Sequence, residues 1–542
     1  MAEHPIGQLM SACRRGLAWL AIVAASWALL GCGSLPKDVE RPVSSALAAG
    51  VSTPLGELAR SRRSATARPG DSGFALIDSA NKAYASRLAL TQGATRTLDV
   101  QSYAIHADSS SAELLREMRV AAARGVRVRI LLDDFHATGR NAVILRMAFV
   151  PNVEMRMYNP LPGGRGSGVL RALGALHDFT RIQHRMHNKL FIADNAWGIT
   201  GGRNLGDAYF GTAEGSNFID LDVLAAGPVV RDMSASFDRY WNSPLAYPVQ
   251  SLITREELQV MRDQYGSAAS GTPTPMSHGA ADVRPSAPTV VKASPASPPL
   301  DLRQLPLVWA AGALLVDKPL KLLPEISDDG TQDTVVDGML GLMKSAQRDV
   351  LIVSPYFVPG AAMMRVFADL RRRDVRVRVL TNSLSSNDAP LAHVGYARYR
   401  DDLLKIGVEL HEMRALHRGR LDRTMLGSGD GGSKASLHAK LFIIDGRIIS
   451  IGSMNLDLRS QLQNTEVALV VRSRTLSGEA ARQVDDTLDD GAWRLERSPE
   501  GRLRWRAPPG APFEDATSEP DASLPLRLML MILGPFAPDE LL

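Results

Sequence analysis

Cysteine is nearly absent from this chain, whose 542 residues include only Cys13 and Cys32. Everything after position 32 therefore lacks a thiol that could form a disulfide or a cysteine-ligated zinc site. An excess of one charge is also missing, because 62 Lys and Arg residues against 58 Asp and Glu residues leave a formal net charge of +4. Dedicated nucleic-acid-binding proteins usually carry a clustered basic surface, so this balance argues against that class.

The N-terminal apolar run, Leu17–Leu30, is too short to cross a bilayer comfortably. It follows two arginines and ends at LLGC, with Cys32 last. This pattern resembles a bacterial lipoprotein signal peptide, which predicts removal of residues 1–31 and lipidation of Cys32. The alternative is a short membrane anchor with an incidental cysteine. Both readings place the protein on a membrane.

The most informative stretch occurs twice. Leu437–Asp445 reads LHAKLFIID, and Met186–Asp194 reads MHNKLFIAD. The two copies lie 251 positions apart (438 minus 187), and the same offset relates a later Gly-[Gly/Ser]-x-Asn element. A repeat at nearly half the chain length indicates duplication of a whole domain. The paired positions are His187 and His438, Lys189 and Lys440, Asp194 and Asp445, Gly201 and Gly452, and Asn204 and Asn455.

Strand and helix patterns alternate in both halves, which predicts α/β domains with layered sheets. Strands are expected at 97–103, 126–132 and 153–157, and single continuous strands at 185–193, 218–226 and 438–445. In an extended strand His438 and Lys440 would face the same side. The predicted divisions are a signal peptide (1–31), a flexible tether (32–70), a first domain (71–250), a Ser/Ala/Pro-rich linker (251–304), a second domain (305–500) and a tail (501–542).

Symmetric pairs of His, Lys and Asn predict one shared site on a pseudo-two-fold axis. Lysine ammoniums and asparagine amides supply hydrogen-bond donors suited to anionic oxygens, so a phosphate is the expected ligand. One imidazole can attack phosphorus while the other protonates the leaving alkoxide. No metal is expected: His184, His187 and His438 could be imagined as ligands, but each motif places a lysine where a metal would require a neutral or anionic donor.

A nucleophilic histidine needs a carboxylate to fix its tautomer. Asp222 and Glu466 each open a short apolar strand after the Gly-x-x-Asn element and are predicted to orient the histidines, with Asp220 a close competitor to Asp222. Asp194 and Asp445 complete the motif as candidate catalytic residues. Alternatively, they tie the motif loop or pair with a lysine.

The complete pattern, His-x-Lys-x4-Asp followed by Gly-[Gly/Ser]-x-Asn, resembles the signature of the phospholipase D superfamily. Within it the chain is most similar to bacterial cardiolipin synthases, particularly the C type. The resemblance covers roughly residues 75–250 and 305–500. It is carried by TLDVQSY (97–103), GVRVRILLDD (125–134), RMHNKLFIAD (185–194), GGRNLGDAYFG (201–211), YFVP (356–359), LTNSLSSND (380–388), GYARYR (395–400), ASLHAKLFIIDG (435–446) and NTE (464–466).

The resemblance implies two duplicated α/β/α sandwich domains and exchange through a phosphatidyl-histidine without a cofactor. It implies His187 as nucleophile and His438 as acid and then base, with Lys189, Lys440, Asn204 and Asn455 binding phosphate. Phosphatidylglycerol would be the acceptor, and phosphatidylethanolamine or phosphatidylglycerol the donor. A phospholipase D that transfers to water is the nearest alternative, and a nucleic-acid phosphodiesterase is disfavoured. The expected location is the bacterial envelope, facing the periplasm; any accessory protein and the role of the apolar segment 524–536 are left open.

Overall fold

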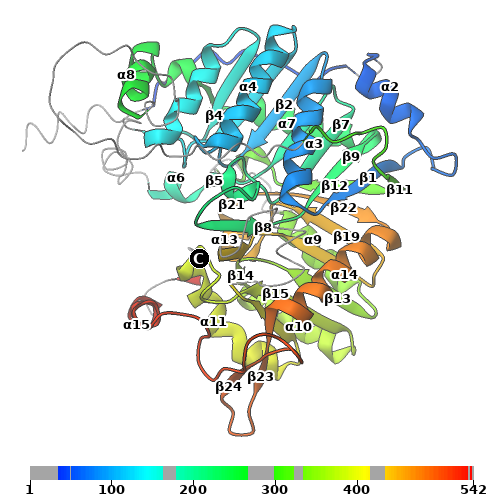
Figure 1. Ribbon diagram of the computed structural model, residues 1–542, viewed down its shortest axis with the longest axis vertical. Coiled ribbons are helices and arrows are strands. Elements are labelled where there is room, and N and C mark those ends of the chain that lie inside the picture. Colours follow the sequence, from blue (N-terminus) through cyan, green and yellow to red (C-terminus); the bar gives the residue numbers. More distant parts are fainter. Residues whose placement is uncertain are drawn as a thin grey trace, which may run out of the picture.

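A computed structural model describes residues 35–48, 51–162, 179–265, 298–322, 334–415, 434–534 and 538–539. The predicted signal peptide, Cys32 and linker residues 266–297 lie outside these ranges. Within them, each half of the chain builds one nine-stranded mixed sheet, and the two sheets lie one above the other in Figure 1.

Eight strands of each sheet follow the same spatial order, as the duplication predicts. The first sheet runs β10 (Ala246–Pro248), β4 (Val153–Tyr158), β3 (Arg127–Asp133), β2 (Thr97–Ser102), β6 (Leu190–Ala193), β7 (Trp197–Gly201), β9 (Asp222–Ala226), β1 (Ser72–Ile77) and β11 (Val308–Ala310). The second runs, in the matching direction, β24 (Leu503–Arg506), β23 (Ala492–Arg497), β16 (Glu409–Met413), β15 (Arg376–Asn382), β13 (Asp349–Val353), β18 (Leu441–Ile444), β19 (Ile448–Gly452), β22 (Val467–Arg472) and β12 (Gly312–Val316).

Helices cover both faces of each sheet and form three hydrophobic cores. The outer face of the first sheet packs against α3 (Ala80–Gly93), α4 (Ser109–Ala123), α8 (Arg255–Tyr265) and the 3-10 segment η1 (Gly139–Phe149). The outer face of the second packs against α9 (Val335–Lys344), α10 (Gly360–Arg372) and α11 (Pro390–Lys405). A central core shared by both sheets takes in α7 (Pro228–Trp241) and α14 (Arg474–Gly491).

The apolar runs of the two motifs become central strands buried on both faces. All four residues of β6 and all four of β18 are buried. Strands covered by helices on both sides need no polar alternation, so they appear in the sequence as continuous apolar stretches. This explains why Leu190–Ala193 and Leu441–Ile444 contain no polar residue.

The sequence predicted continuous motif strands, and this prediction is wrong, because each strand is interrupted at its polar residues. The predicted strand 185–193 is divided into β5 (Arg185–Met186) and β6, and 218–226 into β8 (Ser216–Ile219) and β9. His438 and Lys440 likewise precede β18 instead of lying in it. The chain leaves the main sheet at these points because it pairs with the opposite half: β5 with β21 (Asn464–Thr465), and β17 (Lys434–Leu437) with β8.

The predicted flexible tether is instead packed on the first domain where it is described. The Arg129 guanidinium donates to the carbonyl oxygen of Ser44, and Asp238 accepts from the Ala46 N–H. Helix α2 (Pro54–Ser61) buries Leu55 and Ala59 in the first core. A segment rich in Ser, Arg and Ala shows little periodicity, so its few anchoring contacts were not visible in the sequence.

Both sheets also extend past the predicted domain limits. Strand β11 pairs with β1 of the first sheet, and only Ala311 separates it from β12 of the second. Strand β24 forms a hairpin with β23, so the predicted tail supplies an edge strand. The apolar C-terminal segment left open by the sequence forms α15 (Leu524–Leu533), beside α11 in Figure 1. None of the described helices is long and apolar enough to cross a membrane.

Candidate active site

The two motif histidines are placed by backbone contacts that cross between the halves. The His187 N–H donates to the Thr465 carbonyl oxygen at 2.9 Å, and the His438 N–H donates to that of Ile219 at 2.7 Å. Thr465 and Ile219 end the short strands β21 and β8, each just before a buried acid. Each histidine is therefore held against the half to which it does not belong.

The residue ahead of each histidine is fixed by its own half. Asp133, at the end of β3, accepts from the Met186 N–H at 2.8 Å. Its counterpart Asn382, at the end of β15, accepts from the Leu437 N–H at 2.9 Å and donates to the Leu437 carbonyl oxygen at 2.9 Å. The similar sequences GVRVRILLD (125–133) and DVRVRVLTN (374–382) thus end in side chains that anchor the two histidine segments.

Glu466 of the second half binds His187 of the first. Its carboxylate oxygens lie 3.0 and 3.1 Å from His187 Nδ1. The hydroxyls of Ser453 and Ser460 donate to the same carboxylate at 2.5 and 3.0 Å. Because Glu466 occupies Nδ1, Nε2 is the ring nitrogen of His187 that is left to react. The structure places Glu466 where the sequence predicted an orienting acid.

The partner of His438 is Asp220, not Asp222. Asp220 Oδ2 lies 2.7 Å from His438 Nδ1. Asp222, predicted to orient a histidine, instead pairs with Arg87 at 3.0 Å and Arg203 at 3.3 Å. The prediction that Asp222 orients a histidine is therefore wrong, and the alternative residue Asp220 holds His438 instead.

Sheet register explains the error. Gly201 of β7 is opposite Asp222 of β9, and the equivalent Gly452 of β19 is opposite Ala468 of β22. Asp222 is thus the counterpart of Ala468, and two residues earlier Asp220 is the counterpart of Glu466. The prediction chose the acid that opens each apolar strand, but β9 begins two residues after Asp220, at Asp222 itself, whereas β22 begins directly after Glu466.

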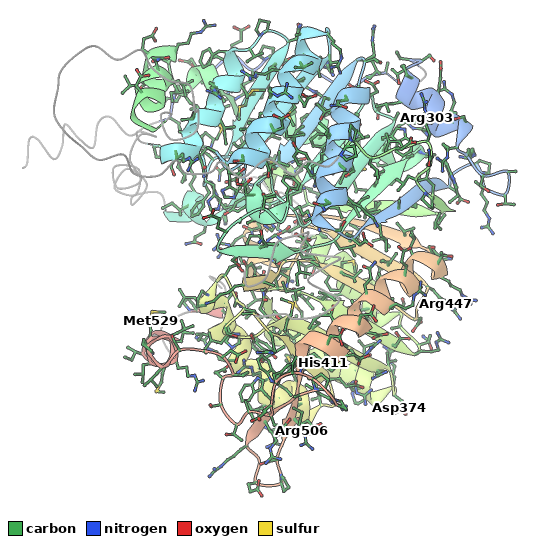
Figure 2. The ribbon with its side chains drawn as sticks, in the orientation of Figure 1. Arg303, Asp374, His411, Arg447, Arg506 and Met529 are labelled. Carbon is green, nitrogen blue, oxygen red and sulfur yellow. The ribbon has the colours of Figure 1, made fainter. Side chains whose placement is uncertain are left out.

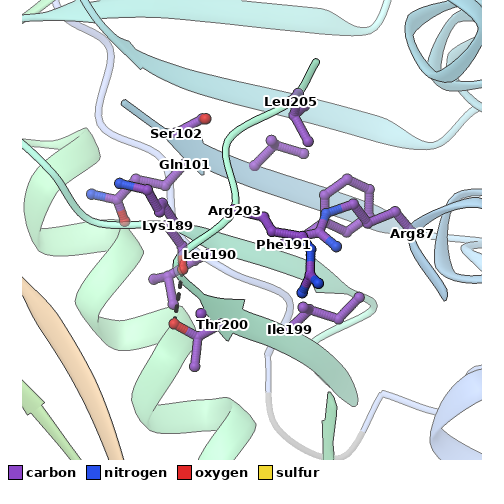
Figure 3. A pocket seen from close by; sticks show the side chains of 12 residues that line it. Arg87, Gln101, Ser102, Lys189, Leu190, Phe191, Ile199, Thr200, Arg203 and Leu205 are labelled. Atoms are coloured by element: carbon purple, nitrogen blue, oxygen red, sulfur yellow. Dashed lines mark hydrogen bonds between the residues drawn. The ribbon is translucent and has the colours of Figure 1, made fainter. Parts of the chain in front are cut away.

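Asp222 has a supporting role behind the site. It is fully buried and holds Arg87 of α3 beside Arg203, whose guanidinium donates to the Asp220 carbonyl oxygen. Figure 3 shows the two arginines together at a small cavity, with Lys189 beyond them. That cavity holds about 10 Å³, roughly the space of one water molecule, so it is not a substrate site.

The Gly-Gly pair makes room for the two aspartates. A Cβ on Gly201 would lie 2.0 Å from Asp222 Oδ1, and a Cβ on Gly202 would lie 2.4 Å from Asp220 Oδ1. In the second half Ser453 replaces Gly202 and donates to Glu466. The Gly/Ser variation in the motif therefore follows from how closely each acid approaches the turn.

The two imidazoles have different electrostatic surroundings. Burial, followed by the charges of Lys189 and Lys440, lowers the pKa of His187 well below its usual value. Burial and Lys440 also lower the pKa of His438, but there the charge and hydrogen bond of Asp220 act in the opposite direction. At His438 the charge and hydrogen bond of Asp220 therefore offset part of the effect of burial on the pKa.

The two lysines are buried, and the charges of both acids act on each of them. Their ammonium groups donate to the carbonyl oxygens of His187 and His438, at 2.7 Å for Lys189 and 2.6 Å for Lys440. Burial lowers the pKa of Lys189 to about 7 and that of Lys440 to about 8, although Glu466 and Asp220 raise both. Burial destabilises the positive charge of both lysines, so an anion that enters the site would stabilise their charged forms.

The two motif asparagines border the same cavity as the histidines. Asn204 donates to the Tyr209 hydroxyl at 2.8 Å and accepts from the Ala104 N–H at 3.3 Å. The buried Oδ1 of Asn455 has no hydrogen-bond partner among the described residues. The structure therefore brings together both histidines and both asparagines, with the lysines directly behind the histidines.

Asp194 and Asp445, predicted as candidate catalytic residues, bind backbone N–H groups in the structure and are not among the side chains that line the cavity. Asp194 accepts from the backbone N–H groups of residues 95, 96 and 97, and Asp445 from those of residues 347, 348 and 349. Both have φ of 52°, a conformation that Asp tolerates in tight turns. The alternative that these aspartates tie a motif loop is confirmed, because each clamps the turn before the sheet's central strand.

A cavity of about 620 Å³ opens above the histidines, between the halves. Tyr103 packs on His187 with ring centres 5.1 Å apart, and Tyr209 and Phe218 pack on His438 at 5.4 and 5.0 Å. The first half adds polar side chains, His106, Asp108 and His136, to the lining. The second adds the apolar Leu391 and Ala392, together with Tyr356, whose hydroxyl donates to Asp388 at 2.8 Å.

One protein family matches each half of the chain separately. The family described as "Cardiolipin synthase, PLD-like domain" matches residues 88–241 and 339–489. Cardiolipin synthase C of Escherichia coli is 37% identical over 447 residues, which cover 81% of this chain and 89% of that protein. The chain belongs to the cardiolipin synthase family of phospholipase D-like proteins. An uncharacterized Helicobacter pylori protein is 32% identical over 88% of this chain and 90% of its own length.

Among solved structures, the fold is similar to that of the phosphatidylserine synthase of Haemophilus influenzae. The TM-score is 0.54 at 14% sequence identity, with 86% of this chain and 94% of that protein covered. At this identity the match shows the fold alone. It agrees with the duplicated α/β architecture expected from the sequence.

Several side chains at the site of this cardiolipin synthase family member were not predicted from the sequence. Ser453 and Ser460 bind Glu466, Arg203 supports Asp220, and Tyr103 and Tyr209 pack on the histidines. Ser453 alone carried a signal, since it occupies the variable position of the Gly-[Gly/Ser]-x-Asn element. Arg203 occupies the unspecified position of the same element, and Ser460, Tyr103 and Tyr209 stand outside the paired positions, so only the fold shows that they reach the site.

Proposed function

We propose that this protein is a cardiolipin synthase that transfers a phosphatidyl group to phosphatidylglycerol through a phosphatidyl-histidine. The observation that carries the proposal is the pair of imidazoles on one cavity, each bound at Nδ1 by a carboxylate of the other half. Family membership and the similarity to Escherichia coli cardiolipin synthase C support the same activity.

In the first step, Nε2 of neutral His187 attacks the phosphorus of the donor lipid. The phosphorus–oxygen bond to the headgroup breaks, and protonated His438 gives its proton to the leaving alkoxide. The electrostatic difference between the histidines supports this order, because a strongly lowered pKa keeps His187 neutral while Asp220 favours the charged form of His438.

In the second step, His438 takes the proton of a phosphatidylglycerol hydroxyl, whose oxygen attacks the same phosphorus. The phosphorus–nitrogen bond breaks, and His187 is released in its neutral form. Lys189, Lys440, Asn204 and Asn455 would bind the phosphate oxygens in both steps. Glu466 and Asp220 would hold the rings and stabilise the imidazolium forms.

The test is product analysis by mass spectrometry. The purified protein is given phosphatidylglycerol vesicles, with and without phosphatidylethanolamine, beside a His187→Ala control. Cardiolipin together with released ethanolamine or glycerol supports the synthase and identifies the donor. Phosphatidic acid as the sole product would replace the proposal with phospholipase D hydrolysis, in which water is the acceptor.

The envelope location is a separate part of the proposal. The LLGC sequence supports lipidation at Cys32 and a site facing the periplasm. Mass spectrometry of the mature N-terminal peptide from envelope fractions should find diacylglycerol on Cys32. An unprocessed N-terminus containing residues 1–31 would overturn lipidation and favour the anchor alternative.

A further inference from the structure

Helix α15 carries an unusual share of the exposed apolar surface. Among the described residues, twelve large hydrophobic side chains are exposed, and five of them lie on this ten-residue helix. No other described element exposes more than one. Concentrated apolar surface of this kind marks an interaction site, whereas scattered residues do not. The five are Leu524, Leu528, Met529, Met531 and Ile532.

Both sides of α15 are apolar, but only one is covered. Leu530 is 6% exposed and packs with Leu384 and Ala522, and Leu526 joins this small cluster. The outward stripe, Leu524, Leu528, Met531 and Ile532, follows the i, i+4, i+7, i+8 spacing of one helix face. Figure 2 shows α15 nearly end-on at the edge of the molecule, with side chains directed away from the domain.

The outward stripe also lacks charge. Arg527 is the single charged residue of α15, and its guanidinium donates to the Ser518 hydroxyl and the Glu519 carbonyl oxygen. The cation is thus directed back toward the chain that leads into the helix. The exposed face is left to leucine, methionine and isoleucine.

Helix α15 is attached to the helix that borders the active-site cavity. Val394 of α11 contacts the Gly534 end of α15, and Arg398 of α11 donates to the Gly534 carbonyl oxygen. Leu391 lies on the same face of α11, because positions 391, 394 and 398 are three and four residues apart. Leu391 lines the cavity and is 45% exposed. Helix α11 therefore connects α15 to an exposed apolar side chain that lines the cavity.

Two further exposed apolar residues lie by the same mouth. Phe135 packs against the cavity-lining His136, with ring centres 5.1 Å apart, and is itself exposed. Leu462 is the last residue of α13 (Leu458–Leu462), the helix that supplies Arg459 to the lining. Eight of the twelve exposed large hydrophobic residues thus belong to α15 or to elements that form the cavity.

We propose that the outward stripe of α15, with Leu391, Phe135 and Leu462, forms a docking surface for a phospholipid bilayer. The choice of a bilayer rests on the proposed function, since a lipid must pass from a membrane into this cavity. A ten-residue helix cannot span a bilayer, but an uncharged apolar stripe can lie in its interface. Docking would bring the cavity mouth to the lipid surface.

The direct test is site-specific fluorescence on the full chain. In a Cys13→Ser/Cys32→Ser background, Met531→Cys is labelled with an environment-sensitive fluorophore and mixed with phosphatidylglycerol vesicles that contain lipids spin-labelled on the acyl chain. Docking predicts a blue shift and strong quenching at position 531. The matched control is Val260→Cys on α8, an exposed apolar site away from the cavity, where neither change is expected.

Three outcomes would overturn the proposal. Equal quenching at positions 260 and 531 would mean that another segment tethers the protein without orienting it. No quenching at 531 on vesicle-bound protein would exclude α15 from the interface. A blue shift that needs no vesicles but rises with protein concentration would assign the stripe to a second copy of the chain. Because these readings require no turnover, they stand apart from failure of the proposed function.

A kinetic comparison provides the second arm. Leu528→Gln/Ile532→Gln removes apolar area from the stripe, so turnover of lipid in vesicles should fall about tenfold or more, while turnover of the same lipid in detergent micelles stays unchanged. Val260→Gln should alter neither. Equal loss in vesicles and micelles would overturn the docking role, and absence of turnover in both by the wild-type protein would contradict the proposed function instead.

Discussion

The two histidine sites share one backbone plan but differ in their acids. Glu466 is buried, and burial raises its pKa to about 7 although Lys189 and the serine hydroxyls act against this. Asp220 is also buried, but the charges of His438 and Arg203 outweigh burial and lower its pKa to about 2. Duplication thus preserved the geometry while the surroundings of the two carboxylates diverged. A symmetric frame can in this way supply one neutral and one proton-donating imidazole.

The largest expected effect comes from removing either histidine. His187→Ala and His438→Ala should each lower kcat by roughly 10⁴- to 10⁶-fold, and the double variant should be no worse, because groups that act as a unit are not additive. Radiolabelled transfer assays in detergent micelles measure all three. Substantial activity in either single variant would contradict a shared site.

The next comparison separates the two neighbouring aspartates. Asp220→Asn should lower kcat by about 10²- to 10⁴-fold with little change in stability, because it disturbs the tautomer and charge of His438. Asp222→Asn should instead lower the free energy of unfolding by roughly 3–5 kcal/mol, because Arg87 and Arg203 lose a buried partner. Denaturant titration beside kinetics distinguishes them, and the reverse pattern would restore Asp222 as the orienting acid.

The turn residues beside the two acids should differ in sensitivity. Gly202→Ala should reduce kcat by about 10²-fold, since its Cβ would displace the Asp220 carboxylate and misplace His438. Ser453→Ala removes one hydrogen bond from Glu466 and should cost roughly tenfold. Gly70→Ala, where a Cβ meets nothing within 4 Å, is the matched control. Equal effects at 202 and 453 would show that the turns are equivalent.

The smallest effect concerns pH. The raised pKa of Glu466 means that its carboxylate becomes protonated as pH falls through about 7, so kcat/KM should decline there. The lowered pKa values of Lys189 and Lys440 mean that positive charge is lost as pH rises through about 7 and 8, so kcat/KM should also decline above that range. Each limb should approach about tenfold per pH unit. In Glu466→Gln the acidic limb should disappear; if it persists, another group controls it.

The sequence predicted well what the duplication repeats. The paired His, Lys and Asn residues, Glu466 and most helices and strands follow from motifs and periodicity, since buried strands and capped helices leave local patterns. Asp220 and the interruption of the motif strands could not be settled, because both depend on pairing between segments of opposite halves. The same holds for residues 35–48, which are held by hydrogen bonds to the distant Arg129 and Asp238 and show no apolar pattern of their own.

The crossing of acids between the halves has a consequence for how this site could arise. A single copy of the domain would contain a histidine without its acid and an acid without its histidine, so two copies would have to meet before either ring was oriented. Joining both copies in one chain replaces that encounter by an intramolecular contact at high effective concentration. Assembly of the site then no longer depends on how sparsely the protein is distributed over a membrane.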